Sequence, residues 1–170
     1  MRFNLKNILL ILLVASCASC AYKPRFLKEN NQNFEPICCF TLASNIKNQQ
    51  KIYHYIENGW EKYPNQKELR YYYNLKNYLT IFQTPINGNN HGKIKSIQTD
   101  YLSKSDTGLI AHGIKLIIEI ENTNNLIQKY EVEIFRPFYS TLKATRNRID
   151  KEVTTALNEA FTQLHNKIVN

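Results

Sequence analysis

The chain has 170 residues, of which 43% are hydrophobic, and its formal net charge is +8. This length suits one domain with a substantial core once short terminal segments are set aside. A basic surface could face nucleic acid or anionic lipid. The sequence contains no Lys/Arg run of the kind that marks a nucleic-acid patch, so we expect no nucleic-acid partner.

An export signal occupies the first 16 residues. Arg2 and Lys6 precede an unbroken apolar run at 8–14, which two small residues follow. The order basic, apolar, small is typical of a secretory signal. The apolar run has only about a third of the roughly 20 residues that a membrane-spanning helix needs, so a permanent span is not expected. We expect residues 1–16 to be removed as a signal peptide.

The residues at the end of this signal point to a lipid anchor. Val14-Ala15-Ser16-Cys17 resembles the lipobox of bacterial lipoproteins, which implies that Cys17 carries a diacylglycerol and a further acyl chain. Each buried CH₂ contributes about 0.8 kcal/mol, so two or three chains hold a protein firmly to a membrane. Cys20 also follows two small residues and is the less favoured alternative. Since no Asp follows Cys17, the resemblance implies a domain in the periplasm, tethered to the outer membrane.

Three further cysteines are left if Cys17 is acylated: Cys20, Cys38 and Cys39. Disulfides persist in exported proteins, so one of the neighbours Cys38 and Cys39 could pair with Cys20 while the other is buried. Nothing in the local sequence supplies the positioned His that a catalytic thiol needs. We therefore expect no reactive cysteine.

The remaining chain divides into a polar stretch and a folded domain. Residues 17–33 are polar and predict a flexible tether, and the domain is expected over 34–170. The apolar segment 37–42 predicts a first strand, whereas 52–56 fits either a strand or a helical turn. Apolar residues spaced by three and four predict an amphipathic helix over 66–83.

The second half has the clearest pattern. Period-two alternation over 110–120 and again over 126–134 predicts an antiparallel hairpin, which a strand at 94–102 extends to a meander. A continuous apolar stripe predicts a long helix over 147–168. The sequence therefore predicts an α+β two-layer sandwich, with an antiparallel sheet and two helices packed on one face.

The search for catalytic groups favours a protein that is not an enzyme. The four histidines form no metal-binding pattern, and there is neither a nucleophile elbow nor a phosphate-binding glycine loop. His112 falls on the apolar face of its strand, as expected of a core histidine. Glu131 and Glu133 alternate beside lysines, which favours a solvated charge ladder over an acid/base pair. We expect no cofactor and no metal.

Aromatic residues are dense between residues 60 and 78. If the 66–83 segment is a helix, its tyrosines point to all sides and cannot all belong to the core. They could then contact a partner or a lipid headgroup region, or pack on the helix with their hydroxyls in solvent. The sequence leaves these two alternatives open. The aromatic residues concerned are Trp60, Tyr63, Tyr71, Tyr72, Tyr73 and Tyr78.

One segment in this region carries a family resemblance. Tyr55, Asn58, Trp60 and Pro64 match the Y-x-x-N-x-W-x-x-x-P segment of ABC-type transport auxiliary lipoproteins. The resemblance implies a non-catalytic accessory subunit of an MCE-type phospholipid transport system. Its implied partners are a permease, an ATPase and an MCE protein, with contact to phospholipid itself also implied.

A second resemblance competes with the first. Residues 20–26, Cys-Ala-Tyr-Lys-Pro-Arg-Phe, are similar to the Cys-Gly-aromatic-x-Pro start of lipopolysaccharide-assembly lipoproteins. That resemblance implies acylation of Cys20 and binding to an outer-membrane β-barrel. The identity of the acylated cysteine therefore bears on the choice between the two functions.

Overall fold

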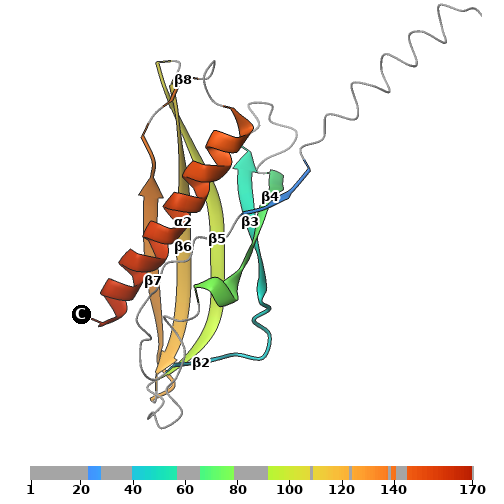
Figure 1. Cartoon of the computed structure of the whole chain (residues 1–170). Helices are drawn as coiled ribbons and strands as arrows, with labels where there is room; N and C mark the ends of the chain where they lie inside the picture. Colours follow the sequence, from blue (N-terminus) through green and yellow to red (C-terminus); the bar gives the residue numbers. More distant parts are fainter. Residues whose placement is uncertain are drawn as a thin grey trace, which may run out of the picture.

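The computed structural model describes residues 23–27, 40–56, 66–78, 92–107, 109–122, 124–137, 139–140 and 145–169. Within these ranges, eight strands form a single mixed sheet, and the helix α2 lies across one of its faces (Figure 1). No helix in the described part of the chain has both the length and the apolar character needed to cross a bilayer. The elements are β1 (Arg25–Phe26), β2 (Phe40–Leu42), β3 (Gln49–Ile56), β4 (Gln66–Asn74), the 3-10 turn η1 (Leu75–Asn77), β5 (Gly92–Asp106), β6 (Leu109–Asn122), β7 (Ile127–Phe135), β8 (Tyr139–Ser140) and α2 (Arg146–Val169).

The sheet has the order β1-β4-β3-β5-β6-β7, with β2 also pairing with β5 and β8 with β6. The antiparallel β5–β6–β7 meander confirms the prediction from the alternating pattern, and β5 and β6 are longer than expected. The segment 52–56, which fitted a strand or a helical turn, belongs to β3 and runs parallel to β5. Because β1 and β2 also pair in parallel, the sheet is mixed and not antiparallel throughout.

The prediction of two helices on one face was wrong. Residues 66–74, expected in the first helix, form strand β4. Within the described part of 66–83, the helical residues are those of the short η1 turn. The run of three tyrosines has high strand propensity, and Tyr71, Tyr73 and Leu75 alternate as in a strand. Both Tyr71 and Tyr73 are buried. The structure is therefore mostly β, with one long helix on the sheet.

The long C-terminal helix is confirmed, and its apolar stripe forms one side of the core. The stripe packs against the face of the sheet formed by the even-numbered residues of β6, which include Ile114, Leu116 and Ile118. Arg136, just after β7, bonds both Glu152 and Glu159 and so ties the end of the sheet to the helix. The fully buried residues of the stripe are Val153, Ala156, Leu157, Ala160, Phe161 and Leu164.

The folded part begins earlier than the sequence predicts. Within the segment 17–33, expected to be a flexible tether, Arg25 and Phe26 pair with β4 and Leu27 is buried in the core. The Arg25 guanidinium also forms an ion pair with Asp150 in α2. This strand therefore fixes the chain to the sheet and to the first turns of the helix, ahead of the expected boundary at Phe34.

Gly113 allows a close approach between β6 and β7. A Cβ atom at this position would lie 2.5 Å from the backbone oxygen of Ile134 and 2.8 Å from the Phe135 ring. Since the backbone oxygen belongs to the paired strand, it can move only by disturbing the β6–β7 ladder. We expect Gly113→Ala to lower the free energy of unfolding by about 1–3 kcal/mol, the usual cost of overpacking. A denaturant titration measures this loss, and an unchanged midpoint would contradict the close approach.

Candidate functional site

A pocket of about 270 Å³ lies between the sheet and the first turns of α2. Two histidines line it, His54 from β3 and His112 from β6, on either side of Tyr101 in β5. Other polar lining residues are Arg70 from β4, Ser103, Lys104 and Ser105 from β5, and Arg146 from α2. The pocket thus collects hydrogen-bonding groups from five different elements.

Tyr101 holds the two histidines together. Its ring meets the His54 ring edge-on, with 4.8 Å between centroids, and stacks on the His112 ring at 5.9 Å. The Tyr101 hydroxyl also forms a hydrogen bond with Nδ1 of His112. The phenol is the better donor of the two groups, so we place its proton on the bond to Nδ1. His112 then carries its own proton on Nε2, which is buried without a hydrogen-bond partner.

The same argument orients His54. Its Nδ1 lies 3.4 Å from Nη2 of Arg70, a group that can only donate. Nδ1 is therefore the acceptor, and Nε2 carries the proton that it donates to Oγ of Ser103 at 3.1 Å. Since that hydroxyl oxygen accepts from His54, its own proton is available to a further acceptor. Ser103 and His112, which both line the pocket, thus each keep a proton that no described group accepts.

Burial keeps both histidines neutral at pH 7. Burial lowers the pKa of His54, and the nearby Arg70 cation lowers it further. Burial also lowers the pKa of His112, against an opposing effect of the Glu152 carboxylate. Each ring therefore holds one proton, as the hydrogen-bond assignment requires.

These pKa shifts predict a pH-dependent stability. In the unfolded chain both histidines have the ordinary pKa of 6.5, so below about that pH the unfolded state binds more protons than the folded state. We expect the melting temperature to fall as pH decreases from about 7.5 to about 5.5, a range above the titration of ordinary carboxylates. In His112→Gln the fall should be smaller. Equal slopes for the wild-type protein and this variant would contradict a neutral His112.

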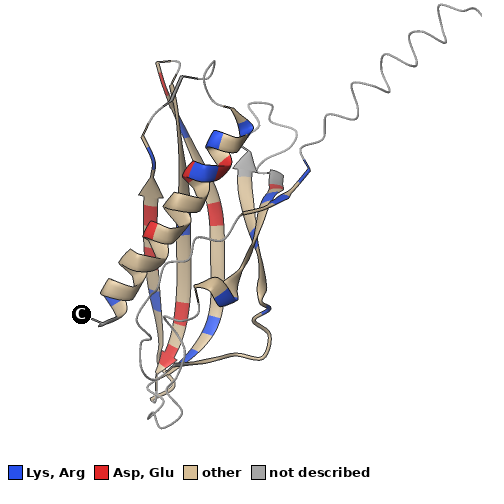
Figure 2. Ribbon diagram, in the orientation of Figure 1, with Lys and Arg blue, Asp and Glu red and all other residues tan. Residues whose placement is uncertain are grey.

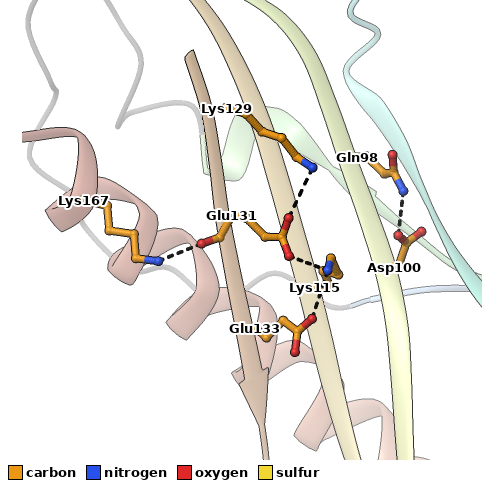
Figure 3. Close-up of polar contacts among 7 residues, drawn as sticks. All are labelled: Gln98, Asp100, Lys115, Lys129, Glu131, Glu133 and Lys167. Carbon is orange, nitrogen blue, oxygen red and sulfur yellow. Dashed lines mark hydrogen bonds and ion pairs between the residues drawn. The ribbon is translucent and has the colours of Figure 1, made fainter.

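The structure supports the predicted charge ladder. Lys115 on β6 pairs with both Glu131 and Glu133 on β7, and Lys129 lies 3.4 Å from Glu131 (Figure 3). These side chains lie on the face of the sheet opposite α2, where solvent reaches them. The neighbouring Lys115 cation lowers the pKa of Glu131. Both glutamates therefore pair with lysines, and their arrangement does not favour an acid/base pair.

Most residues singled out by the family resemblances lie outside the described residues: Cys17, Cys20, Asn58, Trp60 and Pro64, together with Cys38 and Cys39. Tyr55 lies in β3 opposite Lys67, and the description covers only its backbone. Across the described ranges, no three His, Cys, Asp or Glu residues are grouped so that they could hold a metal ion.

The tyrosines of β4 follow the alternation of a strand. Tyr71 and Tyr73 point into the core, where Tyr73 bonds the Thr99 hydroxyl at 2.9 Å. Tyr72 points to the opposite face and stacks on Phe26 of β1. Tyr78 is also buried. The two alternatives that the sequence left open both assumed a helix, and the strand replaces them with one outward and three buried tyrosines among those described.

The sequence did not predict that His54 and His112 lie in the same pocket. The two residues are 58 positions apart in the chain, and no local pattern links them. The expectation for His112 was partly correct, because its side chain is only 5% exposed and bonded at Nδ1. Its unpartnered Nε2 and its place in a pocket were not foreseen. The parallel pairing of β3 with β5, which sets His54 opposite Tyr101, creates this cluster.

Comparisons with known proteins add little to this picture. No family model matches the sequence, and no curated protein matches it significantly. Among solved structures, the chain is similar to protein XCC0632 from Xanthomonas campestris, described as a DUF330 protein. The two are 14% identical with a TM-score of 0.37, over 88% of this chain and 90% of the other. Likeness at this level supports no conclusion about this chain.

Proposed function

We propose that the chain is a lipid-anchored, non-catalytic auxiliary subunit of an ABC/MCE-type phospholipid transport system in the cell envelope. The observation that carries the proposal is the segment of Tyr55, Asn58, Trp60 and Pro64, downstream of the lipobox that ends at Cys17. The anchor holds the domain at the membrane surface. The sheet and α2 then supply a rigid body that docks on transporter subunits.

The charge ladder and the surface around it support a docking role. The face of the sheet opposite α2 carries Lys115, Glu131 and Glu133, which are only partly shielded from solvent. Figure 2 shows that charged residues of both signs recur along the strands and helix. Mixed charge of this kind favours specific orientation of a protein partner, because complementary charges set the register of an interface.

Affinity purification from membranes tests the proposal. The full-length chain, carrying a C-terminal tag and solubilised in mild detergent, should recover a permease, an ATPase or an MCE protein. Lys115→Glu reverses the sign at the centre of the charge ladder and should reduce that recovery, whereas Lys151→Glu makes the same change on an exposed part of α2 and should not. Recovery of none of these subunits would contradict the transport role.

The alternative function is that of a lipopolysaccharide-assembly lipoprotein bound to an outer-membrane β-barrel. The similarity of residues 20–26 to the start of that family favours it. The same purification distinguishes the two functions, since this role requires a large barrel protein in the eluate. Acylation at Cys20 instead of Cys17 would be consistent with the same outcome.

A further inference from the structure

We propose that the pocket between His54, His112 and the N-terminal end of α2 binds a phosphate group, presented by a phospholipid at the membrane surface. The proposal rests on the membrane attachment in the proposed function for the source of the phosphate, and on the pocket itself for the chemistry. The pocket provides hydrogen-bond donors and positive charge from several elements around a partly open volume of about 270 Å³.

The hydrogen-bond pattern of the pocket requires an acceptor. Nε2 of His112 is buried and carries a proton with no partner, once Tyr101 donates to Nδ1. A buried donor without a partner costs about 1–3 kcal/mol, so a ligand that accepts from it is favoured. The Ser103 hydroxyl accepts from His54 and can donate its own proton. An oxyanion, which accepts several hydrogen bonds and donates none, matches both groups.

Charge favours the same class of ligand. Arg70 and Arg146 line the pocket and no carboxylate does. Glu68 offsets part of the Arg70 charge through an ion pair of 2.8 Å. Lys104 also lines the pocket, but its ammonium lies over the Phe135 ring on the other face of the sheet. Arg146 is also the first residue of α2, a helix of 24 residues whose N-terminal end is favourable for anions. Figure 2 shows basic residues at the start of α2, with acidic residues beside them in the next turn.

Phosphate fits better than a carboxylate because a tetrahedral group offers more oxygens to donors that converge from different sides. Tyr71, Ile110 and Ile149 supply an apolar part of the wall, against which the carbon atoms of a headgroup can pack. The pocket thus suits a phosphate that is attached to an organic group.

The pocket lies within reach of the membrane that the anchor would contact. β1 pairs with β4 beside Tyr71, which lines the pocket, and Arg25 pairs with Asp150, next to the lining residue Ile149. Cys17 precedes Arg25 by eight residues. Fully extended, this stretch spans at most roughly 26–29 Å. A lipid on Cys17 therefore keeps the pocket close to the headgroups of the bilayer.

Binding to the mature, lipidated protein in non-ionic detergent tests the proposal. One titration uses inorganic phosphate, and the other uses phosphatidylglycerol in micelles of the same detergent. The imidazole ¹⁵N resonances of His54 and His112 report on the pocket directly, because a phosphate that accepts from these rings shifts their signals. We expect saturable shifts with phosphatidylglycerol at concentrations at least tenfold lower than with inorganic phosphate.

A matched pair of variants separates the pocket from general surface charge. Arg146→Gln should weaken binding about tenfold, whereas Arg148→Gln, in the same exposed turn of α2 but outside the pocket lining, should change it less than twofold. Equal weakening by the two variants, or no shift of either histidine signal with either ligand, would overturn the proposal. Shifts with inorganic phosphate alone would overturn the lipid as the source.

The two proposals fail separately. If the affinity purification recovers transporter subunits but neither ligand shifts the histidine signals, the phosphate site is wrong and the docking role stands. If phosphatidylglycerol binds and Arg146→Gln weakens it, while no transporter subunit is recovered, the site stands and the transport role is wrong.

Discussion

Replacing Phe161 with alanine should lower the free energy of unfolding by about 3–5 kcal/mol, the cost typical of a fully buried phenylalanine. Phe161 is 0% exposed at the centre of the apolar stripe of α2. Its ring stacks on Tyr78 at 4.5 Å and meets Tyr73 at 6.1 Å, so the substitution leaves a cavity where the helix joins two aromatic residues. A guanidinium titration followed by circular dichroism measures the loss.

Phe26→Ala is the matched control for this effect. Phe26 is 55% exposed on β1, and among the described residues its ring stacks on Tyr72, so the same change should cost less than about 1 kcal/mol. A similar loss for both variants would show that α2 does not pack on the sheet through Phe161. If Phe161→Ala fails to fold, Phe161→Leu keeps most of the buried volume and should give a smaller, measurable loss.

The elements that the sequence predicted correctly are those whose pattern is local. In β6, apolar even-numbered residues alternate with Lys115 and Glu119, and only a strand places them on opposite faces. In α2, the apolar stripe continues from Ile149 to Ile168, and a helix is the structure that places this spacing on one face. In β6 and in α2, the residues that make up the pattern all support the same secondary structure.

The 66–83 segment shows where local pattern fails. Leu69, Tyr72 and Leu75 fit a helical spacing, while Tyr71, Tyr73 and Leu75 fit a strand. Whether this segment forms a helix or a strand depends on the strands beside it, because β4 pairs with β3 on one side and with β1 on the other. Paired strands satisfy the backbone groups of β4 and bury Tyr71 and Tyr73, which outweighs the helical period.

The candidate pocket was beyond sequence reasoning for a related reason. It depends on β3 running parallel to β5. Parallel strands need a long connection, and the sequence of neither strand indicates that the two are paired. This pairing brings His54 opposite Tyr101, and the β5–β6 hairpin then brings His112 to the other side of the same ring. A site built from the side chains of three strands can be recognised only once the order of the strands in the sheet is known.

Cys17→Ser should abolish acylation, so that the protein either appears in the soluble fraction or keeps its signal peptide. Cys20→Ser should leave the mature protein membrane-bound. The lipobox resemblance places the acyl chains on Cys17, and their loss removes several kcal/mol of membrane affinity at about 0.8 kcal/mol per buried CH₂. The two substitutions make the same chemical change three positions apart, so each controls for the other. Fractionation and mass spectrometry of the mature N-terminus measure the outcome.

The opposite result, membrane attachment through Cys20, would favour the lipopolysaccharide-assembly alternative and would also change the geometry at the membrane. Cys20 precedes Arg25 by five residues, a reach of at most roughly 17–18 Å, compared with roughly 26–29 Å from Cys17. Because Arg25 is fixed to Asp150 at the edge of the pocket, a shorter tether would hold the pocket nearer the headgroups. The position of the acylated cysteine, read from the mass of the mature N-terminus, would therefore weigh between the two proposed functions and would set the distance over which a phospholipid could reach His112.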